Sequence, residues 1–123
     1  MKKVLILLFF AADICVAQVD LNKGLKAYYP FNGNAKDASG NNNHPVFNNA
    51  TITADRFGNH NSAYHFNGVY QYMRIPNKPS LNFSDQISLS VWVRPTGFYY
   101  DICHASQVIS KGGGNYNPGN YAL

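Results

Sequence analysis

Residues 25–68 read LKAYYPFNGNAKDASGNNNHPVFNNATITADRFGNHNSAYHFNG. Two aromatic runs in this stretch, AYYPF and SAYHF, each end in Phe-Asn-Gly, at residues 31–33 and 66–68. Asn and Gly both tolerate the positive φ that a tight reversal needs, so each triplet predicts a turn after a strand. The segment between the two runs is rich in Asn and has few apolar residues to bury. This layout predicts an all-β module rather than a helical one.

The strongest periodic signal lies further along the chain, at residues 86–95. Ile87, Leu89, Val91 and Val93 fall on one face of an extended chain, and polar residues alternate with them. Strict alternation of this length predicts a strand with one buried face. Turn signals every 8–12 residues favour an antiparallel β-sandwich. The strands we expect lie at residues 25–31, 50–54, 63–66, 70–75, 86–95, 108–111 and 121–123.

Composition limits the classes of protein that fit this chain. Its 123 residues suffice for one small domain. All six acidic residues are Asp, because the sequence contains no Glu. The formal net charge is +4, but Lys and Arg are scattered singly after residue 3. Nucleic-acid binding needs a clustered basic surface, so the sequence argues against a nucleic-acid partner.

Residues 1–17 have the pattern of a secretory signal peptide. Lys2 and Lys3 form a basic start, an apolar run follows, and Cys15-Val16-Ala17 resembles a cleavage site. The apolar run is too short for a permanent membrane anchor, which argues against an integral membrane protein. Lipid attachment at Cys15 is the alternative to ordinary cleavage. We therefore expect a secreted or cell-surface protein, with residues 18–24 as a short linker.

The order of the motifs supports a family resemblance. AYYPFNGNAKDASGNNNH, DRFGNHNSAYHFNG, YMRIPNKPSLNF, ISLSVWVRP and VISKGG follow one another along residues 25–123. In this order they resemble the laminin-G-like, concanavalin A-like lectin/glucanase superfamily, and more narrowly its bacterial jelly-roll subgroup. The resemblance implies an antiparallel β-sandwich of jelly-roll type. Family members continue for several strands past the SKG motif, so the resemblance also implies that this domain is incomplete at its C-terminus.

The resemblance implies a disulfide bond and a calcium site. Related members often pair a Cys before the SKG strand with a later one, so Cys103 is expected to have its partner beyond this chain. A free thiol is the alternative.

Lectin-like folds also often bind structural calcium in a loop such as residues 34–43. This loop offers Asp37, Ser39, Asn41 and Asn43 as oxygen ligands. The alternative is that these side chains only cap turns.

Aromatic and basic residues of two expected strands are candidates for a ligand-binding surface. Trp92 is the only tryptophan, and an exposed Trp ring offers sugars a flat apolar platform. Tyr72 and Arg74 would share that face if their strand pairs nearby. The alternative for Trp92 is a place in the core between two sheets.

The sequence argues against catalysis by this chain. The glucanases of the superfamily use paired carboxylates with Glu, and no Glu is present. We expect a non-catalytic extracellular binding module, with carbohydrate or a surface glycoprotein as partner and calcium as the one cofactor to consider. The alternatives are a structural or adhesive module of a large surface protein, and the targeting module of a secreted hydrolase.

Overall fold

The chain is mainly β in the computed structural model, which describes residues 20–97, 107–112 and 120–123. The fold class expected from the sequence is confirmed at this level. Among the described residues, no helix has the length and hydropathy needed to cross a membrane. The elements in chain order are β1 (Phe47–Asn48), β2 (Thr51–Thr53), β3 (Ala63–His65), β4 (Met73–Arg74), the short 3-10 helix η1 (Pro79–Leu81), β5 (Ser110–Lys111) and β6 (Tyr121–Ala122).

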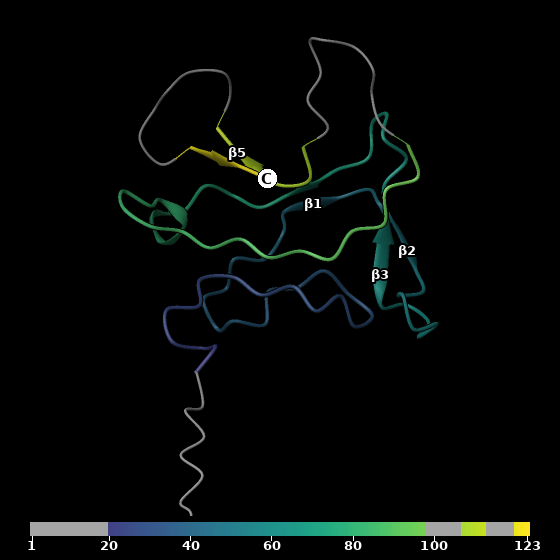
Figure 1. The fold of residues 1–123 in the computed structure, drawn as a ribbon, viewed down its shortest axis with the longest axis horizontal. Coiled ribbons are helices and arrows are strands. Elements are labelled where there is room, and N and C mark those ends of the chain that lie inside the picture. Colours follow the sequence, from purple (N-terminus) through teal and green to yellow (C-terminus); the bar gives the residue numbers. More distant parts are fainter. Residues whose placement is uncertain (1–19, 98–106, 113–119) are drawn as a thin grey trace, which may run out of the picture.

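The strands form three separate antiparallel pairs, which Figure 1 shows at different places on the molecule. β1 pairs with β4, β2 pairs with β3, and β5 pairs with β6. The pair β1–β4 joins residues far apart in the sequence, with Phe47 opposite Arg74. β4, β5 and β6 lie inside strands predicted from the sequence, whereas no strand was expected at the position of β1.

The β2–β3 hairpin follows directly from its sequence. Its β-branched residues Thr51, Ile52 and Thr53 suit a pleated strand, and Ile52 lies opposite Tyr64. The connecting turn is closed by Asp55, whose backbone N–H donates to the carbonyl of Asn59 at 3.0 Å. The predictions of strands at residues 50–54 and 63–66 are confirmed.

The expected first strand, at residues 25–31, is not formed. Phe31 has a φ of 59°, a left-handed value that interrupts an extended strand, and Gly33 follows at 73°. Asn32 does not share this conformation, although we expected it to. The backbone N–H of Gly33 donates to the carbonyl of Asn61 at 2.8 Å, and the Phe31 ring packs edge-on against Tyr64, 5.1 Å between centroids. The segment is therefore attached to the β2–β3 hairpin by a turn and a ring contact.

The expected strand at residues 86–95 is also not formed. No backbone hydrogen bond joins this segment to another strand in the part of the chain that the structure describes. Its apolar side chains are not buried: Ile87 is 41% exposed, Val91 38% and Val93 55%. Across the described ranges no apolar side chain is fully buried. Alternation shows that a segment suits a sheet, but a ladder also requires a partner strand, and no described strand pairs with this one.

Candidate functional site

The loop of residues 34–43 is folded around the carboxylate of Asp37, which is only 6% exposed. One carboxylate oxygen, Oδ1, accepts hydrogen bonds from the backbone N–H groups of Tyr28 and Ser39, both at 2.9 Å. The other, Oδ2, accepts from the backbone N–H of Asn43 at 2.8 Å and from the Ser39 hydroxyl at 2.9 Å. A carboxylate offers about four acceptor positions. All four are therefore filled by donors of the chain itself.

Asn43 is the second buried polar residue of the loop, and it is fully buried. Its side-chain amide donates to the backbone carbonyl of Lys26 at 2.8 Å, and its own backbone carbonyl accepts from the Tyr29 hydroxyl at 2.6 Å. Its side-chain oxygen accepts from the Ser80 hydroxyl, in η1, at 3.3 Å. Asn43 thus joins three segments that are distant in the sequence.

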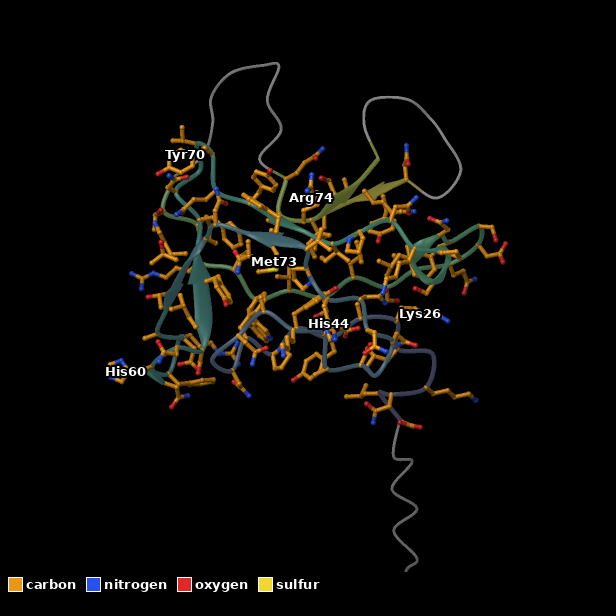
Figure 2. All side chains as sticks on the ribbon, turned by 180° about the vertical axis from the view of Figure 1, so that it is seen from behind. Lys26, His44, His60, Tyr70, Met73 and Arg74 are labelled. Carbon is orange, nitrogen blue, oxygen red and sulfur yellow. The ribbon has the colours of Figure 1, made fainter. Side chains whose placement is uncertain are left out.

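The exposed residues of the loop extend the same pattern. The side-chain amide of Asn41 donates to the carbonyls of Leu25 and Lys26, at 2.9 and 3.2 Å. Nδ1 of His44 accepts a hydrogen bond from the backbone N–H of Asp37 at 3.1 Å. Lys26 and His44, which belong to the segments joined by these hydrogen bonds, are labelled in Figure 2. Most partners of the backbone of residues 25–29 are therefore side chains of this loop, and the backbone N–H of Ala38 adds one more by donating to the Tyr28 carbonyl at 2.7 Å.

The electrostatics of the loop are set by these hydrogen bonds. Burial alone would raise the pKa of Asp37, but donation from the backbone of Tyr28, Ser39 and Asn43 and from the Ser39 hydroxyl outweighs it, so the pKa is lowered. Burial, with a smaller contribution from the negative charge of Asp37, raises the pKa of Tyr29 to about 12. Asp37 is therefore held as an anion and Tyr29 as a neutral hydrogen-bond donor near neutral pH.

This arrangement does not fit a calcium site. Calcium needs six to eight oxygen ligands, and the best of them, the Asp37 carboxylate, already accepts four hydrogen bonds from the chain. Asn41 and Asn43 present their amide N–H₂ groups to backbone carbonyls rather than gathering their oxygens at one point. Asp37 and Ser39 do cap turns, since each accepts a hydrogen bond from the backbone N–H two positions ahead. The amides of Asn41 and Asn43 instead join the loop to the distant residues 25 and 26.

Removing calcium should leave the stability of the protein unchanged. The loop is closed by hydrogen bonds that need no ion, so the melting temperature in a chelator such as EDTA should equal that in millimolar calcium. Differential scanning fluorimetry of the same sample in both buffers checks this. Magnesium serves as the control for a general effect of divalent ions. A rise in melting temperature with calcium but not with magnesium would contradict it.

A second cluster surrounds Trp92, which is 83% exposed. The guanidinium carbon of Arg56 lies over the Trp92 ring, 3.9 Å from its centroid, and 4.5 Å from the centroid of Phe57. Arg56 and Phe57 belong to the β2–β3 turn, so this contact attaches that turn to residues 86–95. The core alternative for Trp92 is wrong, because the ring lies on the surface. We name these three residues, Arg56, Phe57 and Trp92, the aromatic–guanidinium cluster.

The structure does not bring Tyr72 and Arg74 to Trp92. Tyr72 stacks on Phe47, with ring centroids 4.7 Å apart, and Arg74 lies opposite Phe47 in the β1–β4 pair. No ring contact joins Tyr72 to Trp92 among the described residues. The residues that do accompany Trp92, Arg56 and Phe57, were missed. Their signal was a basic residue beside an aromatic one in the short connection between the strands expected at residues 50–54 and 63–66.

Two expected features lie outside the described residues. Cys103 and the leader at residues 1–17 belong to ranges whose structure is not described. Within residues 20–97, 107–112 and 120–123, no group of three or more His, Cys, Asp or Glu side chains could hold a metal ion. Comparisons with family models, with curated proteins and with solved structures found no match to this chain.

Proposed function

We propose that this chain is an exported, non-catalytic binding module that recognises carbohydrate, free or on a surface glycoprotein, outside the cell. The observation that carries the proposal is the position of Trp92, whose side chain is 83% exposed and contacts the guanidinium of Arg56. In this proposal the strand pairs belong to an antiparallel sandwich of concanavalin A-like type. The leader at residues 1–17 supports export, and the order of motifs along residues 25–123 supports the sandwich.

The exposed ring suits a sugar for a physical reason. A Trp side chain in water leaves a large apolar face unburied, and grouped apolar surface of this kind marks binding sites. The C–H groups of a pyranose ring form a flat apolar face of similar size. Phe57, 73% exposed, adds to the same surface. Burial of the Trp92 face under a sugar would therefore supply binding free energy without requiring a deep cavity.

The carboxylates of the described turns support a non-catalytic role. Glycoside hydrolysis requires one carboxylic acid that carries a proton near neutral pH. The pKa of Asp37 is lowered, as described above, and that of Asp55 is lowered chiefly by the side-chain amide of Asn59, with backbone donors adding to it. Both carboxylates are therefore held as anions within their own turns, which suits structure rather than proton transfer.

Trp92→Ala should weaken glycan binding about tenfold or more, because the lost ring contact contributes roughly 1.5 kcal/mol. A glycan array with the full chain identifies a ligand, and isothermal titration then compares the variants. Trp92→Phe keeps an aromatic face and should retain most of the affinity. Tyr70→Ala is the matched control, because Tyr70 is 68% exposed and Figure 2 shows it at the opposite end of the hairpin from His60 and the β2–β3 turn.

Two results would contradict the proposal. A flat array would show that the module binds no carbohydrate. Equal losses of affinity in Trp92→Ala and Tyr70→Ala would show that the exposed ring of Trp92 has no special part in binding.

A further inference from the structure

We propose that the aromatic–guanidinium cluster selects acidic carbohydrate, with Arg56 as the group that binds the ligand's oxyanion. This inference rests on the proposed function and names the class of sugar that the same site would take. The shared chemistry of the ligand is a sugar ring that carries a carboxylate or a sulfate ester.

The first step is the position of the Arg56 side chain. Its guanidinium carbon lies 3.9 Å from the centroid of Trp92 and 4.5 Å from that of Phe57, and both rings are largely exposed. A guanidinium that stacks on an aromatic ring keeps its N–H donors in its own plane, where they remain available. The rings therefore hold the cation in place without using its hydrogen bonds.

The second step is that no described residue supplies an anion to this cation. No carboxylate or other hydrogen-bond acceptor of the described residues pairs with the Arg56 side chain, and the neighbouring Asp55 is engaged elsewhere. Oδ1 of Asp55 accepts from the backbone N–H groups of Phe57 and Asn59, at 2.8 and 2.9 Å, and Oδ2 accepts from the side-chain amide of Asn59 at 2.9 Å. Asp55 thus fixes the turn while its oxygens point into it.

The third step is that the turn is preformed. Gly58 and Asn61 have positive φ values of 86° and 57°, which both residue types tolerate well, and the β2–β3 ladder closes the turn at its base. A preformed site loses little conformational entropy when a ligand binds. The position of Arg56 is thus available before the ligand arrives.

The fourth step is the match between this arrangement and a ligand. Guanidinium recognises planar carboxylate, and sulfate as well, through two parallel N–H donors. The guanidinium covers one face of the Trp92 ring, so the opposite face is the one that takes the apolar side of a sugar ring. Neighbouring units of one oligosaccharide can meet both groups, with an oxyanion on the in-plane donors of Arg56 and a sugar ring on the free face of Trp92. A neutral sugar leaves the charge of Arg56 without a bound counter-ion.

The test compares three oligosaccharide probes by isothermal titration with the full chain: a galacturonate oligomer, a heparin-derived hexasaccharide, and a neutral cello-oligosaccharide. Arg56→Gln should weaken binding of the acidic probe about tenfold, which corresponds to one charged hydrogen-bonded contact, and should change neutral binding less than twofold. Binding of the acidic probe should also fall as salt rises. Lys23→Gln removes the same charge from the exposed entry turn and should have no effect.

Arg56→Lys separates charge from geometry, since it keeps the cation but loses the paired donors. It should bind the acidic probe with an affinity between those of the native chain and Arg56→Gln. The uronate and heparin arms show whether carboxylate or sulfate is preferred. Melting temperatures of all variants should match the native value, because Arg56 is exposed.

The outcomes separate this inference from the proposed function. If neutral probes bind as tightly as acidic ones, or if Arg56→Gln weakens both equally, the acidic selectivity is wrong and the carbohydrate module stands. If no probe and no array glycan binds, both fall.

Discussion

Asp37→Asn should destabilise the protein by about 3 kcal/mol, the largest effect of any single substitution that we expect. Asp37 is 6% exposed and accepts four hydrogen bonds. An amide at this position keeps one acceptor oxygen and places an N–H₂ group against the backbone N–H of Asn43. The loss of charged hydrogen bonds and the buried donor without a partner each cost about 1–3 kcal/mol. Urea denaturation followed by tyrosine fluorescence measures the free energy of unfolding.

The same variant has a defined pH dependence. The pKa of Asp37 is lowered in the folded protein from its ordinary value of 3.8. A lowered carboxyl pKa contributes stability that is present above the unfolded value and is lost as pH falls through the folded value. The difference in stability between native and Asp37→Asn should therefore be constant near neutral pH and shrink below about pH 4.

Asp20→Asn is the matched control for both measurements. Asp20 is exposed and accepts one hydrogen bond, from the backbone N–H of Asn22 at 2.9 Å. Its substitution should change the free energy of unfolding by less than about 0.5 kcal/mol. Equal effects of Asp20→Asn and Asp37→Asn, or a difference that persists at acidic pH, would show that the Asp37 carboxylate does not organise the loop.

Asn43→Ala should destabilise the protein by about 2 kcal/mol. Asn43 is fully buried, and its side chain bonds to the carbonyl of Lys26 and to the hydroxyl of Ser80. The Lys26 carbonyl keeps its bond from Asn41, so the cost is two lost hydrogen bonds and the vacated volume rather than an unpaired carbonyl. Chemical denaturation of the native chain and the variant at neutral pH measures the difference in the free energy of unfolding.

Asn41→Ala removes the same side chain from an exposed position of the same loop. Its amide also bonds to backbone carbonyls, at 2.9 and 3.2 Å, but water can replace these bonds at the surface. We expect a cost below about 1 kcal/mol. If the two Asn variants lose the same stability, burial is not what makes Asn43 important.

The sequence predicted best the features that depend on neighbours in the chain. The β2–β3 hairpin follows from the β-branched residues of β2 and from Asp55, whose carboxylate accepts from the backbone N–H groups two and four positions ahead. The turn at residues 66–68 is likewise closed locally, because the side-chain oxygen of Asn67 accepts from the backbone N–H groups of Val69, Tyr70 and Gln71. These contacts span a few residues, so residue type alone indicates them.

Features that depend on distant partners were predicted poorly. The strand expected at residues 25–31 found its partners in side chains of the loop, as when Asp37 accepts from the backbone of Tyr28 nine positions away. Trp92 contacts Arg56, which lies 36 positions earlier in the sequence, and no periodic pattern indicates that contact. For the candidate sites, the sequence singled out Asp37, Asn43 and Trp92, but it did not indicate the groups with which each of them interacts.

The exposed apolar stretch at residues 86–95 should lower the solubility of the protein. This stretch carries Ile, Leu and two Val on one side and a single charged residue, Arg94. Its backbone makes no ladder hydrogen bond to any other described strand. The same segment of another molecule can pair with such an unpaired strand. Charged side chains along an edge normally prevent this pairing, and this stretch has only one. Concentrated preparations of the chain will therefore tend toward precipitation, and dilute samples are the ones in which its surface can be studied.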